Sequence, residues 1–373
     1  MNVLFLWLRS GHIRTGILLG LIVGLTGCTG SCNLFGDQDP EYLVVATYNL
    51  HNLMDDVLNG TEYPEFRPTS PNWNTRKYLE RLGRLNKVVA SLWDQGPDIL
   101  VFTEIENSQV LEDLHRLYLY KLGYRSMAIT QDPNSAIQIA LLSKYPIVET
   151  QIIKPQDGHI HQRSILETLI QIDHRQLRIF SNHWKSKAGG SLEFTEQGRR
   201  ASSHALRSRL QDLQHQGDQI PVLLTGDFNS RRNESTFAGL GHATALVYLS
   251  DSSTIIPHGS LGVTSNRAYG ADRAQEHIFF SPWLGWIEED RYRYEQVADS
   301  ISGSYYFQGV WEDIDHFFLC SQLMDNPWFS FHGFFVAGFD FLLTPDGTPW
   351  EYNVRTGRGY SDHLPIVLIL GLH

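Results

Sequence analysis

The chain has 373 residues, of which 42% are hydrophobic and 12% aromatic, a composition typical of a globular core and not of a disordered protein. The formal net charge is −11, which disfavours a protein that clamps nucleic acid nonspecifically through many Lys and Arg contacts with phosphate. A nuclease with a locally positive or metal-loaded cleft is not excluded, because local fields matter more than the total charge.

The N-terminal segment predicts an export signal at residues 1–27. Arg9 and Arg14 precede the apolar stretch 17–25, and Thr26-Gly27-Cys28 follows it. This order of charged, apolar and small residues is typical of a signal peptide, and its end resembles a bacterial lipobox, in which the Cys is lipidated. A transmembrane helix is the alternative, but the stretch falls short of the ~20 apolar residues that span a bilayer.

We therefore expect an exported protein that is lipid-anchored through Cys28 to a bacterial membrane and faces the periplasm or the cell surface. Removing residues 1–27 deletes two arginines and no acid, which leaves 28 basic and 41 acidic residues. Residues 28–41 are polar and fit a tether between anchor and domain. Besides Cys28, only Cys32 and Cys320 are present, and one pair is no disulfide framework, so they are either bridged or free.

From residue 42 to residue 373 we expect one domain in which short apolar runs alternate with helical patterns. Segments 76–93 and 197–214 repeat apolar residues at helical spacing. Segment 327–341 is rich in aromatic residues, for which core packing is favoured over a surface recognition loop. Runs of strand length, rich in Val, Ile, Leu and Phe, lie at 42–50, 98–104, 137–143, 165–172, 177–183, 220–227, 314–320 and 364–370. This order predicts a mixed α/β sandwich whose strand ends meet at one edge, with helices packed outside.

Residues 221–230 (PVLLTGDFNS) are the most informative stretch. A short apolar run stops at Gly226 and is followed by Asp227 and Asn229, which would both project into a cleft at the end of a buried strand. Taken alone, the motif fits an Asx-type turn equally well. Other predicted strand ends carry similar polar residues, namely Asn49, Glu104, His183 and the pair Asp362-His363.

Carboxylate and carboxamide oxygens without cysteine suit a hard cation, so Mg²⁺ or Mn²⁺ is expected and Ca²⁺ is possible. Zinc fits less well, since these residues include no Cys and no His pair at helical ligand spacing. Histidines beside such a metal can donate hydrogen bonds to a phosphoryl oxygen, while a carboxylate orients or deprotonates water. The combination predicts phosphoester hydrolysis.

The ordered set of strand-end residues resembles the endonuclease/exonuclease/phosphatase superfamily, which includes secreted DNases, apurinic endonucleases, sphingomyelinases and inositol polyphosphate phosphatases. The resemblance extends from about residue 42 to about residue 370 and depends on the GDFN motif at 226–229 and the SDHLP motif at 361–365. It implies a DNase I-like four-layer α/β sandwich, in which two mixed β-sheets pack face to face with outer helices. The chain would be a bacterial lipoprotein-type member.

The resemblance also implies roles for the metal-side residues. Asn49, Glu104 and Asp362 match the metal site, with Glu104 as the surest direct ligand. The first strand departs from the bacterial nuclease-like pattern, because His51 stands where an acid is more common. The use of His51 is therefore open.

The remaining matched residues act on water and phosphate. Asp227 matches the residue that orients or deprotonates the attacking water, and Asn229 the residue that holds the scissile phosphate. His183 and His363 match the two histidines that stabilise the pentacovalent transition state. Arg163 stands where related sequences have a phosphate-contacting Arg, although a surface charge is the alternative.

Two further assignments rest on neighbouring motifs. Lys185, together with Lys187, would bring positive charge to the phosphate backbone beside His183, unless both belong to a solvated loop. Either Asp315 or Glu276 is the acid that orients His363, and we choose Asp315 because its segment resembles the penultimate strand of bacterial members. The adjacent His277 and His316 are then structural or support the site from behind.

We therefore expect an exported, divalent-metal-dependent phosphodiesterase that cleaves DNA or RNA, with nucleic acid as substrate and no obligate protein partner. A phosphatase or a sphingomyelinase-like phospholipid phosphodiesterase of the same fold is the alternative. A non-catalytic surface binding module is disfavoured, because the chain retains the full set of metal and phosphate residues.

Overall fold

The computed structural model describes residues 41–156, 162–234, 244–250, 254–267, 277–284 and 301–373. The predicted signal peptide, the predicted lipidation site Cys28, residues 28–40 of the predicted tether and Glu276 lie outside the described residues, whereas Glu41, the last tether position, already belongs to a strand. Contacts divide the chain into Met1–Asp39 and a compact unit from Pro40 to His373. Within the described ranges, the structure contains no helix with the length and apolarity needed to cross a membrane.

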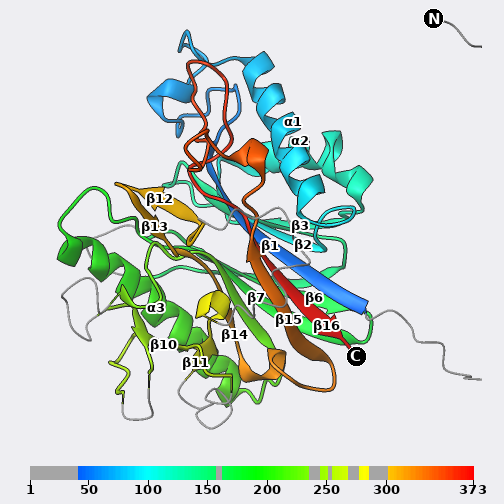
Figure 1. Ribbon diagram of the computed structural model, residues 1–373, viewed down its shortest axis with the longest axis vertical. Helices are drawn as coiled ribbons and strands as arrows, with labels where there is room; N and C mark the ends of the chain where they lie inside the picture. Colours follow the sequence, from blue (N-terminus) through cyan, green and yellow to red (C-terminus); the bar gives the residue numbers. More distant parts are fainter. Residues whose placement is uncertain (1–40, 157–161, 235–243, 251–253, 268–276, 285–300) are drawn as a thin grey trace, which may run out of the picture. The chain divides into compact units, whose positions relative to one another are not determined.

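The compact unit is built on two mixed β-sheets (Figure 1). The six-stranded sheet has the order β15 (Phe329–Val336), β16 (Ile366–Leu372), β1 (Glu41–Leu53), β2 (Ile99–Ile105), β4 (Gln138–Ser143) and β3 (Ser126–Ile129). The eight-stranded sheet has the order β5 (Ile147–Ile153), β6 (Ile165–Ile172), β7 (Arg175–His183), β8 (Val222–Asp227), β14 (Asp315–Leu319), β11 (Ile278–Phe280), β10 (Leu261–Thr264) and β9 (Leu246–Tyr248). A separate hairpin pairs β12 (Tyr305–Phe307) with β13 (Val310–Glu312).

The two sheets pack face to face, because alternate side chains of the central strands point to opposite sides. Ile179 of β7 and Leu223 of β8 belong to the core shared with β1 and β2. Their neighbours Phe180 and Leu224 instead pack with α3 (Leu192–His215) on the outer side. The expected four-layer sandwich is confirmed.

The helices begin at side-chain caps that satisfy free backbone N–H groups. Asn74 caps α1 (Thr75–Leu92), Asn107 caps α2 (Ser108–Leu117) and Ser191 caps α3. The helix predicted at 197–214 thus begins earlier, at Leu192. Short 3₁₀ segments occur at Pro64–Phe66, Leu119–Leu122, Pro282–Leu284, Ser321–Leu323 and Asp340–Leu342.

The strongly apolar strands lie close to their predicted positions, whereas shorter or more exposed elements are absent from the prediction. Strand β5 is exposed over most of its length and β9 to β11 are only three or four residues long, so the sequence carries little periodic signal there. The aromatic segment 327–341 contains edge strand β15, in which Phe329 and Phe335 are buried. Packing, as favoured, is the main use of these residues.

Candidate active site

Strand register alone assembles the first half of the site. Strands β7 and β8 are parallel with His183 opposite Asp227, and β8 and β14 are antiparallel with Asp227 opposite Asp315. Residues opposite one another on paired strands point to the same side of a sheet, so the three side chains form a row. All three are buried, with at most 3% of each residue exposed.

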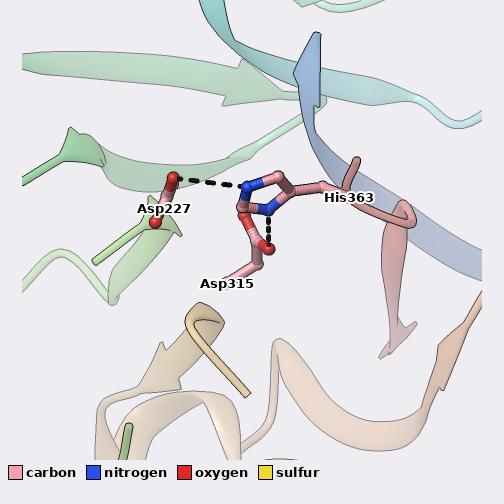
Figure 2. A group of neighbouring side chains, drawn as sticks. All are labelled: Asp227, Asp315 and His363. Atoms are coloured by element: carbon pink, nitrogen blue, oxygen red, sulfur yellow. Dashed lines mark hydrogen bonds and ion pairs between the residues drawn. The ribbon is translucent and has the colours of Figure 1, made fainter. Parts of the chain in front are cut away.

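His363, which precedes β16, completes this row from the other sheet (Figure 2). Its Nδ1 lies 2.7 Å from Oδ2 of Asp315, and its Nε2 lies 4.0 Å from Oδ2 of Asp227. Ser304 Oγ donates a hydrogen bond to the same oxygen of Asp315 at 2.6 Å. Asp315 is thus the acid in contact with His363, as chosen, and the competing Glu276 lies outside the described residues.

Burial and charge give the two histidines opposite protonation states. Burial would lower the pKa of His363, but the carboxylates of Asp315 and Asp362 raise that pKa well above its usual value. For His183, burial lowers the pKa well below its usual value, and the positive charges of Arg163 and His363 lower it further. At neutral pH, His363 is an imidazolium and His183 is neutral.

Asp227 lies between these two rings. Burial, with a further contribution from Asp315, raises the pKa of Asp227 to about 7. The hydrogen bonds that Asp227 accepts from Asn229 and Asn49 act in the opposite direction. A carboxylate with this pKa can exchange a proton near neutral pH, as a general base must.

The metal-side residues come from the six-stranded sheet. Asn49 Nδ2 donates to Oε1 of Glu104 at 3.2 Å and to Oδ2 of Asp227 at 3.0 Å, which links the two sheets. Glu104 has a left-handed backbone with φ of 62°, at a register shift between β2 and its neighbours. Ser361 Oγ donates to the carbonyl of Asn49 at 2.7 Å and so places Asp362 beside β1.

A buried arginine, which sequence reasoning missed, holds the segment that follows Asn49. Arg81 of α1 donates to the carbonyl oxygens of Leu50, His51 and Asn52. His51 and Asn52 are both left-handed, and Asn52 N in turn donates to Oε2 of Glu104 at 2.9 Å. Arg81 is therefore a positioning residue for Glu104. The sequence did contain a sign of this role, because Arg81 is a charged residue within the apolar stripe of α1, next to Leu82.

The donor set on this side fits a hard divalent cation. Glu104 and Asp362 are partly exposed and offer carboxylate oxygens, which Mg²⁺ and Mn²⁺ prefer. Glu104 lies 3.6 Å from Nε2 of His183, whose low pKa leaves the ring uncharged. The Oδ1 of Asn49 accepts a hydrogen bond from His51 N at 2.9 Å. The side-chain nitrogen of Asn49 therefore faces the carboxylates of Glu104 and Asp227.

A second set of donors could also hold a metal. Asp227, Asp315 and His363 each offer an atom within 4.8 Å of the others. Nδ1 of His363 is already paired with Asp315, however, and the three residues together resemble a hydrogen-bonded acid–histidine relay more than an open coordination site.

The phosphate-side residues Asn229 and Arg163 meet at one carbonyl. Trp184 O accepts from Arg163 Nη1 at 2.8 Å and from Asn229 Nδ2 at 3.1 Å. Asn229 is left-handed, and its backbone N–H donates to Asp227 Oδ1 at 2.8 Å. A Cβ on Gly226 would lie 2.1 Å from the carbonyl oxygen of Asn182, so only glycine fits there. In the GDFN motif, Gly226 is therefore required by the backbone geometry, while Asp227 and Asn229 supply the polar groups.

The two lysines near His183 differ in what they can offer a substrate. Lys185 Nζ donates to Ala188 O at 2.9 Å, and burial together with Arg163 and Arg199 lowers its pKa. Lys187 forms ion pairs with Glu234 at 3.1 Å and Glu312 at 3.3 Å. The charge of Lys187 is therefore compensated within the protein, contrary to the expectation that it faces phosphate.

Three further histidines named in the sequence analysis have other surroundings. His51 Nε2 is 3.5 Å from Oε1 of Glu351 on the exposed side of the β1 segment. His316 is buried, pairs with Ser230 O at 2.8 Å and stacks on Phe318, which is consistent with a structural residue. His277 lines a separate cavity of about 260 Å³, which Cys320 also lines, and takes no part in the catalytic row.

Comparisons with known proteins agree with the fold. Residues 44–245 match the model of the Endonuclease/Exonuclease/phosphatase family. No curated protein matches the chain. Caenorhabditis elegans TDP2 has a similar fold, with a TM-score of 0.52 and 13% identity over 90% of this chain and 77% of the other.

Two other TDP2 structures lead to the same conclusion about fold. A truncated Caenorhabditis elegans TDP2 gives a TM-score of 0.52 at 13% identity and covers 88% of this chain and 97% of its own. D. rerio TDP2 in complex with a single-strand DNA product gives 0.50 at 17% identity, over 88% and 99%. These identities support a shared fold only, whereas the family model matches more than half of the chain. The chain belongs to the endonuclease/exonuclease/phosphatase family.

Proposed function

We propose that this protein is an exported, divalent-metal-dependent phosphodiesterase that hydrolyses DNA or RNA by attack of water on phosphorus. The observation that carries the proposal is the placement of Asp227 between a neutral and a charged histidine, with Glu104 linked to Asp227 through Asn49. This arrangement offers a proton acceptor, a cationic hydrogen-bond donor and a carboxylate in one buried site.

In the proposed reaction, Asp227 orients a water molecule and takes its proton as the oxygen attacks phosphorus. The P–O bond to the departing nucleotide oxygen breaks as the new bond forms, and the departing oxygen takes a proton from solvent water. His363, held cationic by Asp315, donates from Nε2 to a phosphoryl oxygen as negative charge develops there. His183 is neutral and can donate a second hydrogen bond without adding charge. Asn229 and Arg163 are partly exposed and lie together at the carbonyl of Trp184, where they can hold the scissile phosphate.

Glu104 and Asp362, with Asn49 in support, would hold a Mg²⁺ or Mn²⁺ ion. When bound, such an ion neutralises charge on the phosphoryl group. Asn49 and Arg81 contribute by fixing the position of the Glu104 carboxylate. The argument for a hard cation is the oxygen-rich donor set.

Nucleic acid is the proposed substrate. D. rerio TDP2, which has a similar fold, binds a single-strand DNA product, and this supports a polynucleotide for the present chain. The signal-peptide pattern at 1–27 and the lipobox-like sequence before Cys28 support export and a lipid anchor at a bacterial membrane. Labelling cells with a radioactive fatty acid tests the anchor, and a Cys28→Ser protein that still carries label would contradict it.

A substrate panel tests the activity. The purified protein is incubated with single-stranded DNA, duplex DNA, RNA, sphingomyelin vesicles and p-nitrophenyl phosphate, each with Mg²⁺, Mn²⁺, Ca²⁺ or EDTA. We expect acid-soluble nucleotides with Mg²⁺ or Mn²⁺ and none with EDTA. Release of a lipid headgroup or of p-nitrophenol without polynucleotide cleavage would replace this proposal with a phospholipid phosphodiesterase or a phosphatase. Inactivity on the whole panel would point to a binding module.

A further inference from the structure

The hairpin β12–β13 belongs to neither of the two large sheets (Figure 1). Its side chains have no role in the proposed reaction. Its two-residue turn, Gln308-Gly309, has positive φ at both positions, the geometry that matches the twist of two antiparallel strands. The tip is apolar: Phe307 and Val310 pair across the turn, and each is 50% exposed.

The two faces of the hairpin differ. Tyr306 and Trp311 contact each other edge to face at 5.3 Å, and Trp311 packs against the main core. Tyr305 and Phe307, two residues apart on one strand, point to the opposite face. One face therefore supports the hairpin, while the tip of the other face, at Phe307 and Val310, remains available to a ligand.

The available face leads directly to the catalytic centre. The ring centroids of Tyr305 and His363 are 4.6 Å apart with planes tilted by 31°, and those of Tyr305 and Phe307 are 6.1 Å apart with planes within 12° of parallel. The rings of His363, Tyr305 and Phe307 form a continuous row, named here the aromatic row. It extends from a group that would touch the scissile phosphate to the exposed tip.

Several contacts fix the hairpin in this position. Ser304, next to Tyr305, donates to Asp315, and Leu364 N donates to Ser304 O at 2.7 Å. On the other strand, Glu312 forms ion pairs with Lys187 and Arg231. The hairpin is thus tied to the same residues that orient His363, so its distance from the reacting phosphate is set by the fold.

We infer that the aromatic row is a stacking platform for a nucleobase next to the scissile phosphate, with Phe307 as the main contact. This inference rests on the proposed function, because it requires a polynucleotide in the site. Every base presents a flat π face, so stacking on Phe and Tyr holds single-stranded nucleic acid without reading its sequence. Bases of a stacked strand follow one another at about 3.4 Å, so the row lies within the first few nucleotides of the cleaved bond. The near-parallel rings favour stacking over insertion of the tip into lipid.

The test compares two single-stranded oligomers of equal length, one of deoxythymidine and one of abasic tetrahydrofuran residues. The measured quantity is the ratio of kcat/KM for the thymidine oligomer to that for the abasic oligomer. In the wild type we expect the ratio to be about 5 to 150, the range expected for one stacked base. In Phe307→Ala the ratio should fall to near 1, mainly through a higher KM for the thymidine oligomer.

Two variants separate stacking from simple apolarity. Phe307→Leu keeps an apolar side chain but has no ring, so it should lose the preference as Phe307→Ala does. Phe307→Trp should keep or increase it. Val310→Ala, at the paired position of the tip, should leave the ratio unchanged.

The outcomes are distinct. A wild-type protein that cleaves neither these oligomers nor any DNA or RNA of the substrate panel contradicts the proposed function itself. Cleavage of both oligomers at equal efficiency, or an unchanged ratio in Phe307→Ala, overturns only the stacking platform. If Phe307→Leu retains the preference while Val310→Ala loses it, the tip acts by aliphatic contact, as at a lipid surface, and the inference is wrong.

Discussion

The two sheets contribute to the candidate active site in different ways. The eight-stranded sheet supplies His183, Asp227 and Asp315 at directly opposed positions of regular strands. The six-stranded sheet supplies Glu104 from a left-handed position, held by Asn52. One half therefore depends on hydrogen-bonded register, and the other on a local backbone that neighbouring elements must maintain.

This difference predicts how each half responds to substitution. Residues placed by register should affect chemistry when changed and leave the fold intact, because the strand ladder remains. The position of Glu104, which the β1 segment maintains, should instead be sensitive to substitution of residues that never touch substrate, such as Arg81. The following predictions sharpen or break the comparison, beginning with the largest expected effect.

The largest loss is expected from Asp227→Asn, which keeps the side-chain shape but removes the proton acceptor. We expect kcat to fall by about 10²- to 10⁴-fold, the usual contribution of a general base. Cleavage of single-stranded DNA in Mg²⁺ measures the effect, and thermal unfolding checks the fold. Asp346→Asn, at an exposed turn, changes a carboxylate that takes part in none of the contacts described for the site and is the control. Activity within a few-fold of wild type in Asp227→Asn would remove Asp227 from the mechanism.

On the metal side of the site, Glu104→Gln should reduce activity by about 100-fold or more at a fixed metal concentration. Substitution of residues that only support a metal ligand commonly lowers metal affinity or activity by about 10- to 100-fold, and loss of a ligand should cost at least as much. The cause would be weaker metal binding, so the Mg²⁺ concentration for half-maximal activity should rise. A titration of activity against Mg²⁺ measures it. If activity survives both Glu104→Gln and EDTA, the metal assignment is wrong.

Arg81→Lys tests the positioning of the β1 segment. Lysine cannot donate to three carbonyl oxygens with the planar fork of arginine, so Glu104 should lose its fixed position. We expect about tenfold weaker activation by Mg²⁺ with a smaller change in the maximal rate. Arg84→Lys, three positions further along the same helix, contacts Gly357 instead and is the matched control. Equal effects of the two substitutions would reduce Arg81 to a structural residue.

The smallest effect concerns stability and the eight-stranded sheet. Burial lowers the pKa of His316 to about 3, so below pH 6.5 the unfolded chain binds a proton that the folded chain excludes. The stability that the neutral ring contributes is complete above pH 6.5 and is lost as the pH falls toward 3. Between pH 7 and pH 5 this amounts to about 2 kcal/mol, at 1.36 kcal/mol per pH unit. The free energy of unfolding, measured with urea at pH 7 and at pH 5, should therefore change less between the two pH values in His316→Gln than in the wild type. The difference between the two proteins should be about 2 kcal/mol.

An equal pH dependence in the wild type and in His316→Gln would mean that His316 binds its proton at the same pH in the folded protein as in the unfolded chain. Its contacts with Ser230 and Phe318 would then need another explanation.

Most of the fold could be predicted, because its central strands are long apolar runs. Strand β6 has the predicted bounds, Ile165–Ile172, and α1 is shifted by one residue. The short strands β9 to β11 were not predictable, since three or four residues contain at most two periods of strand alternation, too few to identify a strand. Helix α2, only ten residues long, was missed for a similar reason.

The candidate site divides in the same way. The residues that matched the GDFN and SDHLP motifs do lie together, and their metal and catalytic roles stay predictions until the variants are tested. Lys187 shows the limit of reasoning from sequence. Its charge was visible, but its partners Glu234 and Glu312 lie 47 or more positions away along the chain. Ser304 and Tyr305 were overlooked because nothing in a serine or tyrosine marks contact with a distant histidine.

The sequence by itself determined the family, the sandwich and the identity of the polar residues at the strand ends, because strand length, apolar content and motif spacing are local properties. Only the tertiary structure decided that Asp315 meets His363, that Arg81 holds the segment beside Glu104, and that an aromatic hairpin borders the site. These contacts join residues far apart in the chain. Their existence depends on backbone register, left-handed residues and burial, which the packed sheets impose together.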